Sequence, residues 1–600
     1  MSPRSPSTAR DRGHRPGSRA GERAVLDSFG VMRGGVGWLA GTPANQKRST
    51  LAVETSDHPL SFLMTDTSEL PITARREIAR RFEELSIFAR PRELALYHCC
   101  AVIDLTGANL TNPDLIFYLG RQALEASSKA IPAIYRKCAI APDVPLRLNP
   151  AIYQEAHELL CYAYLYDQIA MCYEWAEREQ FAVRFDTLSQ QIVFDYASSQ
   201  ESSSDTLLRS RELVANRDET ATPPLLAEIG EISRAAAVTL QGSILSVSTD
   251  EITYPLSPAL LAIARRWSNA LVLARRWEFP ETLAIGGTIT FGDFRKFWSA
   301  LITIVNIHDL AHRITRLPRG SLVNLRPRNE WAELIAEIGG ISVTTASELL
   351  WWFTFDVATA GATPPIQPFF GVSGDRLCVP SIFVSVSNVE RNLLKVMTRH
   401  PRLRAYYQPI KAAKEGIALG HLSQLFPAPK FAIAQRVVIA GVTDADLVVY
   451  ERSSGFVLII QHKWLIAPET RDESNTNDDQ LKEGASQALK ARDAFRLNSD
   501  VLRAPLLLVN ADKIGEIEAI VVCRGAESTG FLEKQPVPII LETAFEDLWT
   551  ENDSLPKLWE KLNARPDHTE AASRYNDTFA VAKLAGYEFR VPTLGKEIVL

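Results

Sequence analysis

The stretch Asp444-Ala-Asp-Leu-Val-Val-Tyr450 alternates polar and apolar side chains, which is the pattern of a β-strand. A turn at Arg452-Ser-Ser-Gly455 connects it to Phe456-Val-Leu-Ile-Ile-Gln-His-Lys-Trp464, a run that stays apolar almost to its end. Because strand side chains alternate, Asp444 and Asp446 share one face, and Gln461 shares a face with Lys463 but not with His462. Because burying polar or charged groups costs free energy, Gln and Lys at the end of a buried strand are expected either to have a functional role or to reach solvent.

The residues on either side of this predicted hairpin predict a compact α/β core. A helix begins near Val389, is interrupted at Pro401, and is followed by a second helix that ends near Phe426. Another helix is predicted over 478–495. Further strands are expected at 432–440, 506–509, 517–523 and 537–541.

The polar end of this hairpin is suited to phosphodiester chemistry. A carboxylate and a neighbouring carbonyl oxygen are hard ligands of the kind that Mg²⁺ prefers. Such a metal lowers the pKa of a bound water and offsets phosphate charge, and a nearby lysine positions the water or stabilises the transition state. The sequence therefore indicates a metal-dependent hydrolytic site.

The pattern Asp446-x14-Gln461-His-Lys463 resembles the PD-(D/E)xK nuclease superfamily. With Gln in place of the usual acidic residue, it most resembles the Mrr-type restriction endonuclease variant. The resemblance extends over roughly 389–549 and implies a restriction endonuclease-like α/β domain. It implies that Asp446 is the metal-binding acid, that Gln461 contributes its amide oxygen to the metal site, and that Lys463 is the catalytic lysine. The implied cofactor is Mg²⁺ or Mn²⁺.

The resemblance implies further members of the site. Such folds often carry an acidic residue on the helix before the first strand, and Glu415 is the best candidate here. A polar residue on the helix after the lysine strand is also common, and Gln487 fits that place. Asp444 replaces or assists Asp446, so the expected metal ligands are Asp446, Gln461, Asp444 and Glu415.

A second observation is independent of the motif. Seven Lys/Arg and no Asp/Glu lie between Arg391 and Lys414. Phosphate contacts from such side chains give affinity that is independent of base sequence and sensitive to salt. We expect this basic segment to bind nucleic acid through Arg399, Arg402, Arg404, Lys411 and Lys414. The alternative is an ordinary solvated helix face.

The rest of the chain bounds the function less closely. Its 600 residues are 46% hydrophobic and 23% charged with a net charge of -6, so a wholly basic nucleic-acid binder is excluded. Seven scattered cysteines without a C-x-x-C pair favour a reducing cytoplasm, and we expect no membrane span. Helical periodicity predicts a mainly α region over 72–196 and again over 225–355, with a short hairpin near 285–291. The helical periodicity then ends, and short strand-like runs follow at 368–372 and 377–386.

These patterns predict a multidomain chain, a mainly α N-terminal and central region followed by the α/β domain. The predicted parts are a disordered basic tail (1–50), a helical domain ending in a Ser-rich linker (51–224), a mainly helical domain (225–370), the restriction endonuclease-like domain (371–550) and a C-terminal extension (551–600).

A pair of histidines in the helical region is a second candidate for metal binding: His308 and His312 lie one helical turn apart. The Glu of H-E-x-x-H and a third zinc ligand are missing, which favours a packed helix.

The predicted function is metal-dependent nuclease activity, with DNA as the expected substrate and prokaryotic defence or DNA processing as the expected setting. The helical region would supply target recognition, self-association or protein contacts. One alternative is a nuclease fold that has lost catalysis and serves as a nucleic-acid-binding or assembly module. Another is a helical interaction protein in which the Gln-His-Lys end is incidental.

Overall fold

Most of the chain is described by the computed structural model. The described residues are 50–52, 70–108, 113–141, 143–177, 181–196, 223–244, 246–247, 252–274, 277, 279–315, 323–356, 366–386, 388–439, 441–467, 471–524, 535–563 and 577–594. The predicted basic tail and nearly all of the Ser-rich linker lie outside them. Thr50–Lys596 form one compact unit, and the second unit, Met1–Ser49 with Glu597–Leu600, lies outside the described residues.

Long helices dominate the first part of the chain, as the helical periodicity predicts. They are α2 (Leu70–Glu83), α3 (Arg92–Ala108), α4 (Pro113–Lys137) and α5 (Pro150–Glu177), with a short 3-10 turn at Ser86–Ala89. Apolar side chains at three- and four-residue spacing on α2, namely Ala74, Ile78 and Phe82, enter a core shared with α3 and α5. The buried faces of these helices therefore supply the stability of this part.

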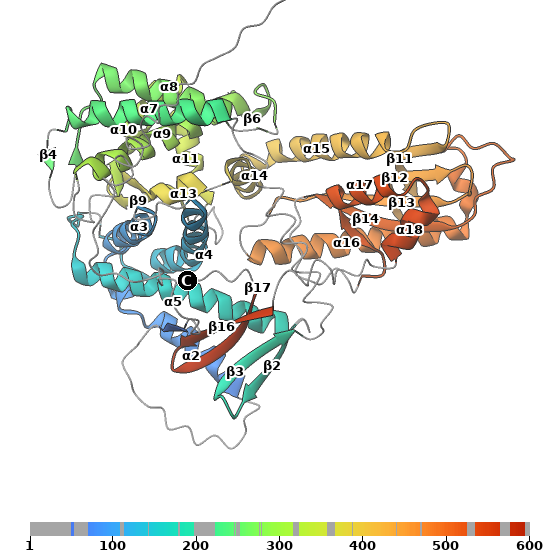
Figure 1. Ribbon diagram of the computed structural model, residues 1–600, viewed down its shortest axis with the longest axis horizontal. Coiled ribbons are helices and arrows are strands. Elements are labelled where there is room, and N and C mark those ends of the chain that lie inside the picture. The colour runs from blue at the N-terminus through green and yellow to red at the C-terminus, as the bar shows by residue number, and fades with distance from the viewer. Residues whose placement is uncertain are drawn as a thin grey trace, which may run out of the picture. The chain divides into compact units, whose positions relative to one another are not determined.

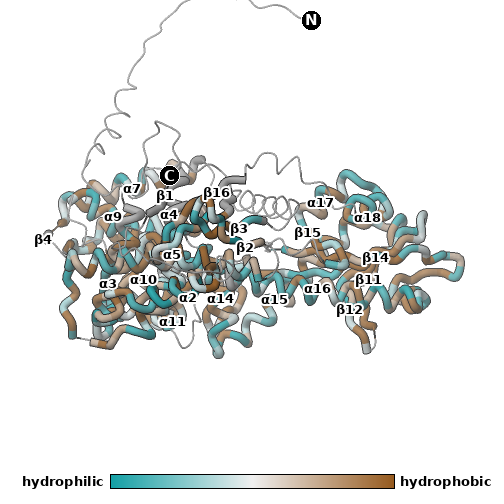
Figure 2. The backbone as a smooth tube through the Cα atoms, turned by 90° about the horizontal axis from the view of Figure 1, so that it is seen from below, coloured by the Kyte–Doolittle hydropathy of each residue, from teal (hydrophilic) through white to brown (hydrophobic). Residues whose placement is uncertain are grey.

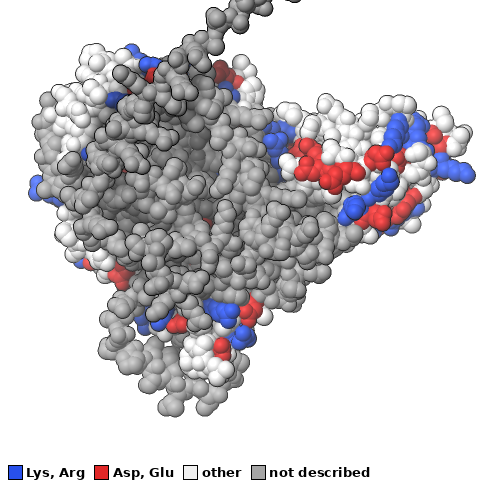
Figure 3. All heavy atoms as spheres, in the orientation of Figure 1, with Lys and Arg blue, Asp and Glu red and all other residues white. Residues whose placement is uncertain are grey.

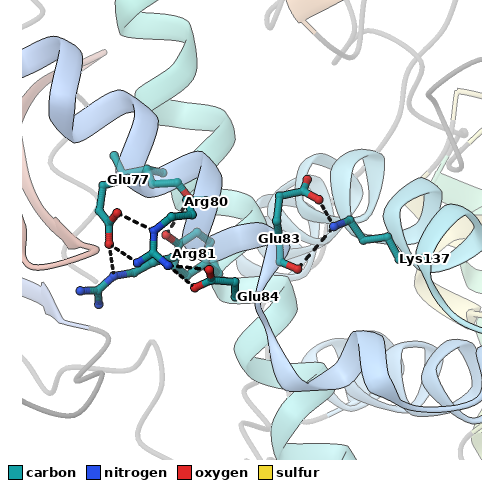
Figure 4. Close-up of polar contacts among 8 residues, drawn as sticks. Glu77, Arg80, Arg81, Glu83, Glu84 and Lys137 are labelled. Atoms are coloured by element: carbon teal, nitrogen blue, oxygen red, sulfur yellow. Dashed lines mark hydrogen bonds and ion pairs between the residues drawn. The ribbon is translucent and has the colours of Figure 1, made fainter.

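Ion pairs hold the outer face of α2 (Figure 4). Glu77 accepts from Arg80 one turn later at 2.8 Å and from Arg81 at 3.0 Å, while Arg80 also contacts Glu84. Hydrogen bonding from Arg80 lowers the pKa of the Glu77 carboxyl to about 2. Glu83 pairs with Lys137 of α4, so the last turn of α2 is tied to a neighbouring helix.

The helical prediction is wrong over 181–196, where the chain forms a hairpin. Strands β2 (Phe181–Asp186) and β3 (Gln191–Tyr196) pair antiparallel around a turn closed by Asp186. Aromatic and β-branched residues in this short stretch favour strand, and the apolar content of α5 masked the change of period. The hairpin joins a five-stranded sheet of order β1-β16-β17-β3-β2, with β1 (Thr50–Ala52), β16 (Asp577–Leu584) and β17 (Tyr587–Leu594). The predicted C-terminal extension thus supplies two strands to this sheet.

A second helical group follows. It contains α7 (Pro223–Gln241), α8 (Pro258–Ala274), α9 (Phe291–Thr315), α10 (Arg328–Gly339) and α11 (Val343–Trp352). Small sheets decorate it: β4 (Ser246–Val247) with β5 (Ile252–Thr253), β6 (Ala284–Gly286) with β7 (Ile289–Thr290), and β8 (Asn324–Pro327) with β10 (Arg376–Val379) and β9 (Phe370–Ser373). The predicted hairpin near 285–291 is confirmed. The predicted strand at 377–386 is half wrong, because Pro380 ends β10 and a short helix, α13 (Ser381–Val386), begins.

Two carboxyl groups meet at the start of α13. Asp104 of α3 accepts a hydrogen bond from the Ser381 backbone amide at 2.5 Å, and Asp309 of α9 accepts from the Ser381 hydroxyl at 3.1 Å. Burial raises the pKa of Asp309 to about 6 and raises the pKa of Asp104 well above its usual range, with the Asp309 charge adding to the effect on Asp104. Three helices therefore converge on acids that resist ionisation.

This pair makes stability depend on pH. A carboxyl whose pKa is higher in the folded than in the unfolded chain stabilises fully below pH 4 and loses that contribution as pH rises through about 6. We expect Asp309→Asn, which keeps an oxygen acceptor, to gain about 2 kcal/mol in stability relative to the wild type between pH 4.5 and pH 8. Urea unfolding at both pH values measures this, and an unchanged difference between variant and wild type would contradict it.

The C-terminal part is the predicted α/β core. Its helices are α14 (Val389–Arg399), α15 (Arg404–Gln424), α16 (Arg471–Leu497), α17 (Glu542–Glu551) and α18 (Leu555–Asn563), with a 3-10 turn at Ser499–Leu502. Its strands are β11 (Phe431–Ile439), β12 (Thr443–Glu451), β13 (Val457–Trp464), β14 (Ile517–Arg524) and β15 (Ile539–Leu541), in that order in one sheet. The first three strands are antiparallel, and β13, β14 and β15 run parallel. The predicted strand at 506–509 is wrong and is a turn.

Helices α15 and α16 cover opposite faces of this mixed sheet (Figure 1). On one face Val457 and Ile459 pack against α16, and on the other Leu458 and Ile460 pack against α15, α17 and α18. The strands are accordingly apolar, whereas α16 is hydrophilic over much of its length (Figure 2). Because β13 is buried on both faces, any polar side chain at its end is held in a fixed direction.

The turn between β12 and β13 depends on glycine. Gly455 has φ +74°, and a Cβ there would lie 2.5 Å from the Lys513 carbonyl oxygen. Glycine alone accommodates both the left-handed backbone and this close approach. The turn fixes the register that brings β12 beside β13. Within the described residues, no helix combines the length and apolar character needed to cross a bilayer.

Candidate active site at the ends of β12 and β13

Asp446 and the Gln-His-Lys end of β13 meet where the two strands stop pairing. The last paired residues before this point are Leu447 and Ile460. Beyond this pair, Asp446 is one residue from Leu447 and accepts a hydrogen bond at its Oδ2 from the backbone amide of His462, two residues past Ile460, at 2.8 Å. The carboxylate of Asp446 therefore takes the place of a backbone ladder bond and is anchored directly to the strand that carries Lys463.

Lys463 lies on the face covered by α16. Its Nζ donates to the Gln487 Oε1 at 2.8 Å, so Gln487 on the following helix is a hydrogen-bond partner of the lysine. The lysine stem runs across Gly484, where a Cβ would lie 2.9 Å from the lysine Cε. Gly484 and Gln487 are three residues apart and so share one face of α16. On this helix, Gly484 therefore leaves space for the lysine stem, and Gln487 fixes the position of the lysine ammonium by accepting its hydrogen bond.

Gln461 occupies the position at which the nuclease motif usually has an acid. Its side chain is 4% exposed, and its Oε1 has no hydrogen-bond partner among the described residues. A buried carbonyl oxygen without a partner costs free energy, on the order of 1 to 3 kcal/mol. Such an oxygen is ready to accept from a water or to bind a cation.

The electrostatics around Asp446 are those of a partly desolvated acid. Burial raises the pKa of the Asp446 carboxyl, the neighbouring Asp444 carboxylate raises it further, and the His462 amide and Lys463 ammonium act in the opposite direction. Asp444 is exposed at the start of β12. The strand-end site, defined as Asp446, Gln461 and Lys463, therefore combines a carboxylate, an unsatisfied carbonyl oxygen and an ammonium group.

Glu415 is not brought to this group by its described contacts. It lies on α15, which covers the other face of the sheet, and its Oε1 is 3.7 Å from the Lys411 Nζ one turn earlier. The sequence correctly placed it on the helix before the first strand, but the direction of its side chain depends on packing that periodicity does not give. Lys411 is accordingly engaged in an ion pair on its own helix.

The basic segment divides into an inner and an outer half. On α14 the side chains of Arg391, Lys395 and Arg399 all pair with Glu473 of α16, and both Lys395 and Arg399 lie 3.5 Å from its Oε1. Arg391 is 4% exposed and Lys395 is 9% exposed. This half joins α14 to α16, so Arg399 has a structural role that the sequence did not reveal.

The outer half follows the end of α14. Arg402 is exposed and lies over the Trp351 ring at 5.6 Å, Arg404 is exposed at the start of α15, and the Lys414 Nζ lies 4.2 Å from the Phe279 ring centroid. The visible face of the α15 to α18 part carries basic and acidic side chains side by side (Figure 3). Any phosphate contact in this region therefore rests on individual side chains, of which Arg402 and Arg404 are the most accessible.

The donor atoms of the strand-end site fit a hard divalent cation. Asp446 offers a carboxylate, Gln461 offers the unpartnered Oε1, and Asp444 lies two residues earlier on the same strand. All of these donors are oxygen atoms, as Mg²⁺ and Mn²⁺ prefer. No protein nitrogen or sulfur ligand belongs to the set, which distinguishes it from a zinc site.

Two other groups of titratable side chains bear on metal binding. His308 and His312 are both buried on α9, with their Nε2 atoms 3.2 Å apart, so they pack against each other.

The sequence analysis did not find a cluster on the face of the sheet covered by α15 and α17, formed by His421 of α15 with Glu542 and Glu546 of α17. The four-residue spacing of the two glutamates was a usable signal. Their proximity to His421 depends on tertiary packing alone.

The arrangement of the strand-end site is thus an anchored acid and a helix-aimed lysine on adjacent strands of a mixed sheet. Comparison with known proteins adds no relative: no family model, no curated protein and no solved structure matches the chain.

Proposed function

We propose that this protein is a metal-dependent nuclease with a restriction endonuclease-like domain, whose active site is Asp446, Gln461 and Lys463. The observation that carries the proposal is the bond from the His462 amide to Asp446, which holds the acid beside the lysine strand. A helix, three antiparallel strands, a second helix and a parallel strand follow one another along the chain around the site, and the strand with Asp446 directly precedes the strand that ends in Gln-His-Lys. DNA is the proposed substrate.

Each residue has a distinct part in the proposed reaction. Asp446 and Gln461 would hold Mg²⁺ or Mn²⁺ through oxygen atoms, with Asp444 in support. The bound metal would offset phosphate charge and acidify a water. Lys463, oriented by Gln487, would donate from its ammonium to the attacking water or to a non-bridging phosphate oxygen. Arg402 and Arg404 would contact the backbone on either side, which predicts binding that weakens steeply with salt.

The test is cleavage of linear, circular and single-stranded DNA by the full chain in Mg²⁺ or Mn²⁺. We expect cutting by the wild type that is lost in Lys463→Met and in Asp446→Ala. Lys490→Met is the matched control, because Lys490 is exposed on α16 outside the strand-end site. Equal cutting by Lys463→Met and the control would remove this site from the mechanism.

One feature favours a second function, a nuclease fold that binds nucleic acid without cutting it. Gln461 is neutral where an acid would strengthen metal binding, and the Lys463 ammonium already has a partner in Gln487. Salt-sensitive DNA binding by the wild type without metal-dependent cutting would support this function. Gln461→Glu tests it further, since the added carboxylate would be expected to restore metal-dependent cutting to an otherwise intact site.

A further inference from the structure

The face of the mixed sheet that lies away from Lys463 carries an unexplained polar cluster. Here His421 of α15 meets two glutamates of α17, with its Nδ1 3.2 Å from the Glu546 Oε1 and 3.6 Å from the Glu542 Oε1. One potential ligand atom from each of these three side chains lies within 4.8 Å of the other two. We name His421, Glu542 and Glu546 the helix-face cluster.

Buried polar atoms without hydrogen bonds lie in and beside this cluster. Glu542 is 7% exposed and its Oε2 has no hydrogen-bond partner among the described residues. His462 of β13 is 3% exposed, and neither of its ring nitrogens has a hydrogen-bond partner there. Its Nε2 lies 3.8 Å from the Glu542 Oε2, which is beyond hydrogen-bond length. Buried polar groups in native proteins are nearly always satisfied, so this density of unsatisfied atoms indicates a missing ligand.

Charge identifies the ligand as a cation. Glu542 and Glu546 are one turn apart on α17, and two like charges at this spacing destabilise a helix. Their carboxylates nevertheless converge on one imidazole nitrogen. Two ligands bound tetrahedrally to Zn²⁺ at about 2.0 to 2.1 Å are themselves about 3.3 Å apart, which is close to the spacing seen here. The distances from the His421 Nδ1 to the two carboxylates, 3.2 and 3.6 Å, therefore fit ligands of one small divalent ion.

We propose that His421, Glu542 and Glu546 form a transition-metal site that takes Zn²⁺ and joins α15 to α17. The His462 ring lies on the buried side of the Glu542 carboxylate, with its Nε2 3.8 Å from the Oε2, on the side where outer partners of metal ligands are usually found. The imidazole ligand distinguishes this site from the all-oxygen strand-end site on the opposite face of β13. His421 and Glu546 are partly exposed, with side chains 51% and 30% accessible, so the ion can enter from solvent. This proposal does not depend on nuclease activity.

The experiment is calorimetric titration of the full chain, stripped with chelator and dialysed, with Zn²⁺ in the presence of millimolar Mg²⁺. We expect saturable binding of one Zn²⁺ at this site, weakened at least tenfold in Glu546→Gln and in His421→Asn. Glu551→Gln is the matched control, because Glu551 is an exposed glutamate at the end of the same helix. Circular dichroism checks that each variant is folded.

The outcomes separate this site from its competitors. Unchanged Zn²⁺ affinity in both Glu546→Gln and His421→Asn overturns the proposal, as does the absence of saturable binding. Loss of binding in Asp446→Asn with retention in Glu546→Gln would assign the ion to the strand-end site and equally overturn it. Retention in Asp446→Asn with loss in Glu546→Gln establishes the helix-face cluster as the zinc site, whether or not the protein cuts DNA.

Discussion

Replacing Glu473 by glutamine is expected to destabilise the protein by about 3 to 5 kcal/mol, the usual cost of removing one partner of a buried ion pair. Glu473 is 3% exposed and is the anion shared by Arg391, Lys395 and Arg399. Glutamine keeps the shape but removes the charge, which leaves three cations of α14 close together without their shared carboxylate. The urea midpoint for unfolding of the full chain measures the loss.

The control for this variant lies on the same helix. Asp479→Asn removes a carboxylate that is 69% exposed and pairs with Lys482, so we expect a change within about 0.5 kcal/mol. Replacing Arg391, Lys395 and Glu473 together by apolar residues should recover much of the lost stability, because the uncompensated buried charge is then gone. A Glu473→Gln protein within 1 kcal/mol of the wild type would contradict the structural role of this network.

Gly484→Ala is expected to lower the DNA cleavage rate about a hundredfold while leaving the fold intact. The new methyl group would lie 2.9 Å from the Lys463 Cε, so the flexible end of the lysine must move away from Gln487. A displacement of about 1 Å at a catalytic group costs a rate factor of this size. Alanine is also the better helix former by about 0.8 to 1 kcal/mol, which offsets the crowding in the folded protein.

A glycine on another helix separates the effect on the lysine position from the effect of alanine on helix stability. Gly230 lies within α7, where a Cβ would meet nothing within 4 Å, so Gly230→Ala should bring the helical gain without any change in rate. Cleavage kinetics and thermal unfolding of the two variants side by side give the comparison. A Gly484→Ala protein that cuts at the wild-type rate would show that the position of the Lys463 side chain against α16 does not matter for the chemistry.

The sheet that holds the strand-end site was predictable because its strands are strongly patterned. β12 alternates and β13 is continuously apolar, and both lie within a residue or two of the predicted bounds. The two-residue period also placed Lys463 and His462 on opposite faces, as their contacts with Gln487 and Glu542 confirm. The local sequence pattern was therefore enough to predict the direction of a side chain wherever that direction depends on a single strand.

The prediction failed where an apolar run was short or where two distant elements decided the outcome. Leu506–Val509 has strand-like composition, yet Arg503 folds it into a turn by donating to the Val509 carbonyl at 3.1 Å. The basic segment was expected to bind nucleic acid, with a solvated helix face as the alternative. Instead its first half pairs with Glu473, which lies within an acidic and polar stretch that gave no sign of pairing with α14. Side-chain partners across such sequence distances are fixed by packing and are invisible to periodicity.

Within the described residues, the hairpin of β2 and β3 pairs with a hairpin, β16 and β17, that lies far later in the chain. Gln191 on β3 hydrogen-bonds Glu588 on β17, 397 residues later in the chain. At the usual 5 to 20 residues per second, a ribosome needs about 20 to 80 seconds to deliver the second strand after the first. Throughout that interval β3 offers an open edge to any other nascent strand. Translation speed and shielding of this edge are therefore expected to govern how much of the protein reaches its native state.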